Sequence, residues 1–265
     1  MRVYPAAAAL RFASLGSVSR GNALLVEAGG TRILLDCGFG LDDSVRRLAR
    51  LGIAPESVTA IVVTHEHDDH IGGVARFARC YRTPVHLTFG TLVASGPAFA
   101  AGKLATVVID GHTPFAIGDL EVFPFPVPHD AREPVQYVFS DGDRRLGVLT
   151  DVGAITAHIE VMLSGLDALV LECNHDETML TCGSYPAVVK RRIAGRFGHL
   201  ANRAAADLLA RLDTRRLRHL VAAHLSQQNN RAQIARAALA AAIGWDGDAI
   251  GIADQDEGFG WRRLD

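Results

Sequence analysis

Apolar residues occur along the chain in short runs that alternate with segments of helical spacing. A continuous run such as residues 59–63 (TAIVV) is typical of a buried strand, and AGGT at residues 28–31 is typical of a hairpin turn. Strands are predicted at residues 23–27, 32–36, 59–63, 84–87, 106–109, 120–124, 135–140, 146–149, 167–171 and 217–222. Helices are predicted at residues 41–51, 71–81, 202–212 and 232–242, and directly after Pro186. Because strands and helices mix throughout, we expect an α/β fold in which helical layers cover sheets.

Length and composition fit one large domain. The 265 residues are 49% hydrophobic and 21% charged and contain no linker, low-complexity tail or repeat, so we expect a single domain over residues 1–265. The formal net charge of -2 excludes a strongly basic, histone-like nucleic-acid binder.

The cysteines and the apolar stretches indicate whether the protein is secreted, membrane-bound or cytoplasmic. The four cysteines lie far apart without a CxxC pair, which suits neither a disulfide scaffold nor a structural zinc knuckle. Arg11 cuts the apolar N-terminal run below the length of a signal peptide, and no apolar stretch approaches the roughly 18 residues that span a bilayer. We therefore expect a cytoplasmic protein without membrane association or an obligatory protein partner.

Ionisable residues stand at or just after the ends of several apolar runs, namely Asp36, His65, Asp151, Glu172 and His224. Strand ends that face a shared cleft are where layered α/β folds place their chemistry. The pattern therefore predicts a functional site at one end of the sheets.

The segment THEHDDH at residues 64–70 carries the strongest chemical signal. On a turn that leaves a strand, His65 and His67 can point the same way and bind one divalent ion, while Asp69 and His70, one step into the next helix, can bind a second. The alternative is a surface turn in which an aspartate caps that helix. Four residues of ligand type at the HxHxDH spacing favour the metal site over the capping turn.

Further ligand-type residues follow later strands. His129 lies in VPHD, Asp151 follows the run 146–149, and His224 follows an apolar strand in AAHLS. Each alone is a weak signal, since such residues are often turn or core groups. Together with the first motif they complete a set for two metal ions, for which zinc is expected and manganese or iron are alternatives.

The order and spacing of these seven residues resemble the metallo-β-lactamase-fold hydrolases, whose HxHxDH motif is followed by a distant His, Asp and His. The resemblance covers nearly the whole chain and implies an αββα four-layer sandwich with the metals at the edge between two sheets. It also implies that Asp151 bridges both ions, with a water or hydroxide between them.

Several short segments resemble the YycJ/VicX-type branch of that family, which implies a phosphodiesterase or nuclease of the 5′–3′ exonuclease kind. They are GSVSRGN at 16–22, NHD at 174–176, YP at 185–186, KRRI at 190–193, GHLAN at 198–202, HLS at 224–226 and NN at 229–230. The chain departs from the usual sequence of this branch at Val18, Arg20 and Ala201. Candidate substrate contacts within these segments are Ser19, Asn22, His175 and Arg191. For His175, a contact to phosphate and a purely structural role are equally open.

The GHLAN segment also resembles a segment of tRNA 3′-processing endonucleases in which a histidine paired with a glutamate assists phosphodiester cleavage. Here the pair would be His199 and Glu172, with Asp69 as a further catalytic candidate. A carboxylate that fixes the imidazole tautomer raises its basicity. The alternative for His199 is a residue that merely precedes the helix starting at Asn202.

The expected reaction is hydrolysis assisted by two metal ions, which lower the pKa of a shared water and clamp the oxygens of an in-line displacement. His199 would protonate the leaving oxygen. Arginines at 191, 192, 196 and 203 can hold phosphates without reading bases, so weakly sequence-selective nucleic acid is the expected substrate. The alternatives are hydrolysis of a small ester, lactone, thioester or β-lactam, because fold alone does not settle substrate, and an iron-dependent binding or redox module.

Overall fold

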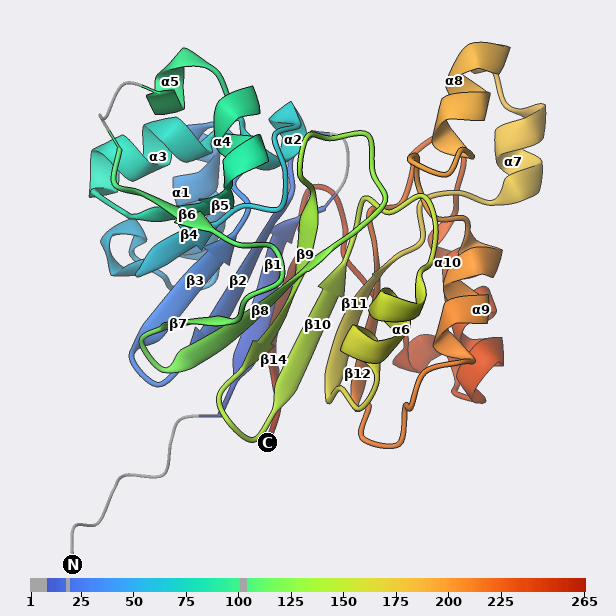
Figure 1. Ribbon diagram of the computed structural model, residues 1–265. Helices are drawn as coiled ribbons and strands as arrows, with labels where there is room; N and C mark the ends of the chain where they lie inside the picture. The colour runs from blue at the N-terminus through green and yellow to red at the C-terminus, as the bar shows by residue number, and fades with distance from the viewer. Residues whose placement is uncertain (1–8, 18–19, 101–103) are drawn as a thin grey trace, which may run out of the picture.

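Two seven-stranded sheets pack face to face, and helices cover the outer face of each (Figure 1). This computed structural model describes residues 9–17, 20–100 and 104–265. The four layers confirm the predicted αββα sandwich. Within the described part of the chain, none of the helices has the length and apolar character to cross a lipid bilayer.

The first sheet is antiparallel at one side and parallel at the other. Its order is β14 (Phe259–Arg263), β1 (Arg11–Gly16), β2 (Ala23–Ala28), β3 (Thr31–Leu35), β4 (Ala60–Val62), β5 (Val85–Thr88) and β6 (Thr106–Ile109). The strands from β3 to β6 run parallel to one another. The helices and 3-10 turn that connect these strands are α1 (Leu41–Arg50), η1 (Pro55–Ser57), α2 (Asp68–Ile71), α3 (Val74–Tyr81), α4 (Phe89–Ala94) and α5 (Pro97–Ala100).

The second sheet has the same plan. Its order is β13 (Gly251–Ile252), β12 (His219–Ala223), β11 (Ala168–Glu172), β10 (Arg145–Leu149), β9 (Val135–Ser140), β8 (Leu120–Pro126) and β7 (Phe115–Ile117). The strands from β10 to β13 run parallel, and the others are antiparallel. The remaining helices and 3-10 turn are α6 (Ala157–Leu163), α7 (Glu177–Cys182), α8 (Ala187–Ile193), α9 (Asn202–Leu209), α10 (Ala232–Ile243) and η2 (Gly247–Ala249).

Three hydrophobic clusters hold these layers together, one between the sheets and one under each helical layer. In β4, Ala60 and Val62 enter the inter-sheet cluster, whereas Ile61 packs under the helices. Successive side chains of a strand point to opposite faces, so a strand with both faces covered must be apolar throughout. This is the physical origin of continuous runs such as residues 59–63.

The structure corrects the sequence-based elements in two places. The helix predicted at residues 71–81 is interrupted at Gly72 and Gly73, so α2 and α3 are separate. A Cβ on Gly73 would overlap the carbonyl oxygen of Phe39, so the close approach of these two backbones requires glycine there. The short strands β1, β7, β13 and β14 and the helices α4 to α7 lie outside the predicted elements.

The carboxyl ends of the parallel strands in both sheets meet at one end of the sandwich, at the upper edge in Figure 1, where α2 lies. Asp36 follows β3, Asp151 follows β10, and His224 follows β12. All three adopt positive φ angles of 59°, 51° and 56°. The left-handed region is unusual for residues other than glycine and is a known feature of functional sites, where it turns a side chain away from the strand direction.

Candidate metal centre

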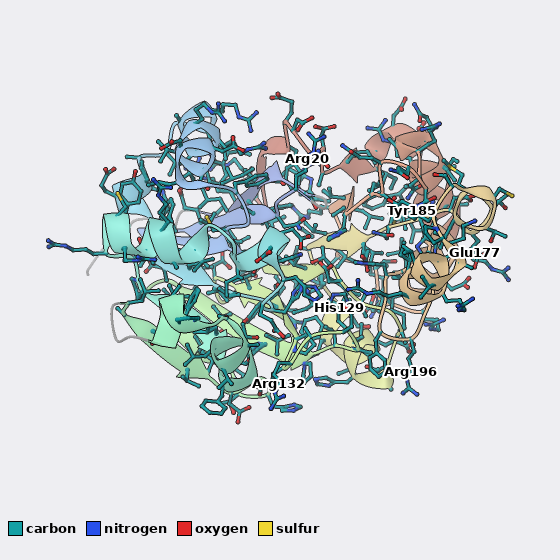
Figure 2. The ribbon with its side chains drawn as sticks, turned by 90° about the horizontal axis from the view of Figure 1, so that it is seen from above. Arg20, His129, Arg132, Glu177, Tyr185 and Arg196 are labelled. Carbon is teal, nitrogen blue, oxygen red and sulfur yellow. The ribbon has the colours of Figure 1, made fainter. Side chains whose placement is uncertain are left out.

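Three imidazoles converge at this end of the sandwich. His67 Nδ1 lies 3.0 Å from His65 Nε2 and 3.3 Å from His129 Nε2. His65 follows β4, His67 precedes α2, and His129 comes from the loop between β8 and β9, near the middle of the view in Figure 2. The HxHxDH turn and a loop more than 60 residues away thus supply one group of ligand atoms.

A second group surrounds the carboxylate of Asp151. Asp151 Oδ2 lies 3.1 Å from both His70 Nε2 and His224 Nδ1, and Asp151 Oδ1 lies 3.8 Å from His129 Nε2. The carboxylate therefore stands between the three-histidine group and the pair His70 and His224. Asp69 Oδ2, on the cleft side, lies 3.5 Å from His70 Nε2. The structure brings together all seven residues that the sequence pattern singled out as ligands.

The polar atoms of this cluster fit a cation. Asp151 Oδ2 and His224 Nδ1 are buried, yet neither has a hydrogen-bond partner of acceptable geometry among the described residues. Buried polar atoms in folded proteins are almost always satisfied, and an unsatisfied carboxylate oxygen beside an unsatisfied imidazole nitrogen is the arrangement that a bound cation would complete. Burial lowers the pKa of His65 well below its usual range, which favours the neutral imidazole that a metal needs. Burial would raise the pKa of Asp151, but His224 and His70 outweigh it and keep that pKa well below its ordinary value.

Two residues behind the ligands, Asp36 and Thr64, were not predicted as ligands or catalytic residues. Asp36 Oδ2 accepts hydrogen bonds from His70 Nδ1 at 2.8 Å and from Thr64 Oγ1 at 2.9 Å, and Asp36 Oδ1 accepts one from the Thr64 amide at 2.8 Å. A carboxylate on Nδ1 fixes the tautomer and leaves Nε2 free as a ligand atom. The position of Asp36 at a strand end was visible in the sequence, but its partner was not.

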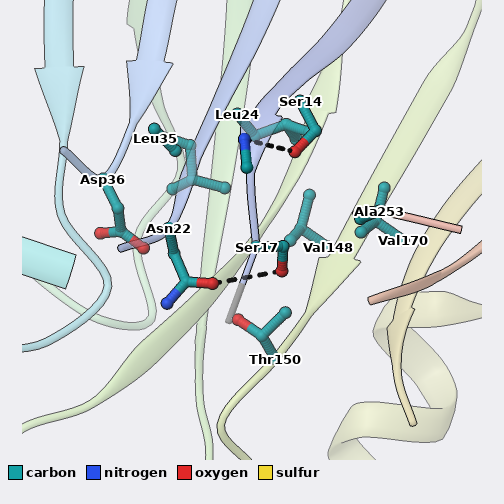
Figure 3. A pocket seen from close by; sticks show the side chains of 12 residues that line it. Ser14, Ser17, Asn22, Leu24, Leu35, Asp36, Val148, Thr150, Val170 and Ala253 are labelled. Carbon is teal, nitrogen blue, oxygen red and sulfur yellow. Dashed lines mark hydrogen bonds between the residues drawn. The ribbon is translucent and has the colours of Figure 1, made fainter. Parts of the chain in front are cut away.

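Asn22 also lies behind the ligands rather than in the cleft. Its Nδ2 donates to Asp69 Oδ2 at 3.1 Å and lies 3.0 Å from His70 Nε2. Its Oδ1 accepts from Ser17 Oγ at 3.1 Å, and Ser17 Oγ accepts from the amide of His224 at 3.1 Å. Figure 3 shows Asn22 and Ser17 in the wall of a small cavity between the sheets. The side chain expected to contact substrate thus connects the N-terminal strands to the metal ligands.

The backbone around Asp69 is tightly packed. The amide of Asn22 donates to the carbonyl oxygen of Asp69 at 2.7 Å. A Cβ on Gly38 would overlap that same carbonyl oxygen. Glycine at position 38 therefore allows the loop after β3 to reach the ligand-bearing turn.

His199 and Glu172 form the predicted pair. His199 Nδ1 donates to Glu172 Oε1 at 2.8 Å, and Glu172 Oε2 accepts from the amides of Val152 and Leu200 at 3.0 and 3.1 Å. Both carboxylate oxygens of Glu172 are therefore occupied by hydrogen bonds, although Glu172 also lies close enough to Asp151, His199 and His224 to hold an ion with them. Burial alone would lower the pKa of His199, but the Glu172 carboxylate raises it to about 9. His199 Nδ1 lies 3.7 Å from Asp151 Oδ1, so the pair borders the metal cluster.

A cleft of about 430 Å³ opens above the cluster. Its walls include His199, His224, Tyr185 and Arg192. Arg191, the arginine expected to contact substrate, is exposed and lies outside the lining of this cleft, whereas its neighbour Arg192 is part of it.

His175, another predicted substrate contact, lies outside this cleft. His175 is 2% exposed and lines a second cavity, on the other side of His199, together with Leu200 and Ala201. Its Nδ1 lies 3.4 Å from Asn174 Oδ1. Ser19 lies outside the described residues. Contact of His175, Ser19 or Arg191 with a substrate stays a prediction.

Comparison with known proteins places the cluster in a family. Residues 31–224 match the family described as the beta-lactamase superfamily domain. The chain belongs to the beta-lactamase superfamily. It is 35% identical over 257 residues to "Exodeoxyribonuclease YycJ" of Bacillus anthracis, which covers 92% of this chain and 93% of that protein. It is 31% identical over 228 residues to "Exodeoxyribonuclease WalJ" of Streptococcus pneumoniae, with 85% of each chain covered.

A solved structure agrees with the fold. The metallo-beta-lactamase fold protein YhfI of Bacillus subtilis superimposes with a TM-score of 0.73 at 14% identity, over 96% of this chain and 98% of that one. The predicted resemblance to the metallo-β-lactamase-fold hydrolases and to their YycJ branch is thereby confirmed. With a His/Asp cluster suited to divalent metals, the chain is a metal-dependent hydrolase of this superfamily.

Proposed function

We propose that the protein is a phosphodiesterase that degrades DNA from an end, as the names of its YycJ and WalJ relatives suggest for those proteins. The observation that carries this proposal is the hydrogen bond of 2.8 Å between His199 and Glu172 beside the metal cluster. Because Nδ1 is engaged by Glu172, the other ring nitrogen, Nε2, is the one available to a substrate in the cleft.

Two divalent ions fit the donor set. His65, His67 and His129 would hold one ion, Asp69, His70 and His224 would hold the other, and Asp151 would contact both. Zinc suits imidazole and carboxylate ligands best, and manganese or iron can take the same set. When bound, such ions lower the pKa of a coordinated water and offset charge on phosphate oxygens.

Proton transfer to the leaving oxygen is the step that the protein itself supplies. A DNA strand leaves as an alkoxide, which is a poor leaving group unless it is protonated. The Glu172 carboxylate raises the pKa of His199 to about 9, which favours the protonated ring, and that ring can give up a proton from Nε2. Glu172 is a positioning residue that holds the ring through Nδ1.

A substrate panel tests the reaction class. We expect metal-loaded protein to cleave single-stranded DNA and bis(p-nitrophenyl) phosphate, and to leave nitrocefin and a lactone intact. Cleavage of nitrocefin or the lactone in preference to both phosphodiesters would contradict the proposal.

Leaving-group dependence tests the role of His199. Replacing a general acid costs about 10²–10⁴-fold for a basic leaving group. We therefore expect His199→Ala to lose at least 100-fold in kcat on DNA but far less on bis(p-nitrophenyl) phosphate, because p-nitrophenolate leaves without protonation. His158→Ala, at an exposed position of α6, is the matched control. Equal losses on both substrates would reduce His199 to a structural role.

A further inference from the structure

One face of α8, together with Tyr185 two residues before the helix, forms part of the wall of the cleft, and the amide of His199 donates to the carbonyl oxygen of Ile193 at the end of this helix at 2.8 Å. Tyr185, Val189, Arg192 and Ile193 line this wall. Within α8, Arg192 and Ile193 follow Val189 by three and four residues, which places these three side chains on one side of the helix. Figure 2 shows Tyr185 on the side of the molecule formed by α7 and α8, with His129 near the centre of the view.

Arg192 gives this face a single cation at the rim of the metal cluster. Arg192 Nε donates to Asp130 Oδ2 at 2.7 Å, and Asp130 Oδ1 lies 3.5 Å from His129 Nε2. In the part of the chain that the structure describes, this is the one hydrogen bond of the Arg192 guanidinium, and its Nη atoms have no protein acceptor. The side chain of Arg192 is 69% exposed. A planar guanidinium held at one nitrogen and free at the others can bind a phosphate with two parallel hydrogen bonds.

The rest of the face is aromatic and apolar. Tyr185 is half-buried in the cleft wall, and Val189 and Ile193 continue the apolar surface one and two turns along the helix. No hydrogen bond of the Tyr185 hydroxyl occurs among the described residues, so the ring rather than the hydroxyl accounts for its place there. An aromatic ring beside a cation is the usual arrangement for binding single-stranded nucleic acid without reading its sequence.

We propose that this face of α8 is the platform for the nucleotide next to the cleaved bond: the Tyr185 ring stacks on its base, and Arg192 pairs with a phosphate. The proposal rests on the proposed phosphodiesterase function and names its substrate subsite. A cleft of about 430 Å³ is of the size that holds one small ligand. A lactone or β-lactam carries neither a phosphate for Arg192 nor a base for Tyr185, so a nucleotide is the occupant that uses both side chains.

Four variants test the platform in the metal-loaded full-length protein. Binding is measured by fluorescence anisotropy with a labelled phosphorothioate oligothymidylate, and kcat/KM is measured with the matching DNA. Tyr185→Ala should weaken binding about fivefold or more, the low end for one stacked base, whereas Tyr185→Phe should restore it to within twofold of wild type. Arg192→Ala should weaken binding and flatten the dependence of log Kd on log salt by about 0.7, the contribution of one phosphate on a single strand. Arg191→Ala, the same change on the outer side of α8, tests the competing arrangement and should alter neither quantity more than twofold.

The outcomes separate this proposal from the proposed function. If wild type cleaves DNA but Tyr185→Ala and Arg192→Ala bind and cleave within twofold of wild type, the platform is wrong and the phosphodiesterase stands. A loss in Arg191→Ala as large as in Arg192→Ala would also overturn it. If wild type cleaves no phosphodiester, the proposed function fails, and the anisotropy series still decides whether this face binds nucleotides. The thermal unfolding midpoint of each variant verifies that it is folded. We expect these midpoints to be unchanged, because the side chains of Tyr185 and Arg192 lie at the surface of the cleft.

Discussion

Replacing Asp36 by asparagine isolates the contribution of the carboxylate behind His70. Asparagine has nearly the same shape and tolerates the positive φ of 59° at this position, so the backbone is not strained. The Thr64 amide donates to Oδ1 at 2.8 Å, which fixes the oxygen of the new amide on that side. The NH₂ group then faces His70 Nδ1, where Asp36 Oδ2 accepts a hydrogen bond at 2.8 Å.

Two donors cannot share that hydrogen bond, so His70 must move its proton from Nδ1 to Nε2. Nε2 is the atom that lies 3.1 Å from Asp151 Oδ2 and that would bind the ion. Metal binding then requires either the unfavourable tautomer or a broken hydrogen bond. Loss of such an outer carboxylate typically costs 10–100-fold in metal affinity, or about 1.4–2.7 kcal/mol.

The assay is metal content after dialysis against a series of buffered free-metal concentrations, with circular dichroism to verify the fold. We expect Asp36→Asn to shift half-occupancy to at least tenfold higher free metal. Asp207→Asn, at a side chain 62% exposed on α9, is the matched control and should not shift it. A folded Asp36→Asn protein that binds metal within twofold of wild type would refute the tautomer reasoning.

Three further predictions follow from packing and burial. Gly38→Ala forces a Cβ into the carbonyl oxygen of Asp69, so we expect urea unfolding to show a free energy of unfolding lower by about 1–3 kcal/mol, together with weaker metal binding. An unchanged free energy of unfolding and unchanged metal affinity would contradict the close approach. Zn²⁺ or Mn²⁺ at 100 times its Kd should raise the free energy of unfolding by about 2.7 kcal/mol per site, a gain that a chelator removes, and identical unfolding curves with and without metal would argue against the centre. A thiol reagent should modify the exposed Cys80 and Cys182 quickly in the native protein, and all four cysteines only after denaturation. Burial shields Cys37 and Cys173 and raises the pKa of both thiols, that of Cys37 to about 11. Rapid reaction of all four cysteines in the native state would count against this packing.

The sequence alone determined the features that depend on neighbouring residues. Apolar runs predicted most strands because a strand covered on both faces has no position for a polar side chain. The turn at residues 28–31 joins β2 and β3 with Ala28 opposite Thr31, as the glycine pair predicted. The HxHxDH segment supplied four ligand-type residues within six positions, and the resemblance to a known family supplied the rest of the set.

Tertiary structure decided which distant side chains meet and which way they face. The order of strands brings His129, Asp151 and His224 to the HxHxDH turn, and these strand pairings join segments far apart in the chain. Periodicity also cannot tell which side of a short polar helix faces a cleft, so Arg191 was expected where Arg192 lies. The rotation of a helix about its axis is fixed by the surface it packs on. The hydrogen bond between His70 and Asp36 was likewise not predictable from the sequence, because it depends on β3 and the turn after β4 lying side by side in the fold.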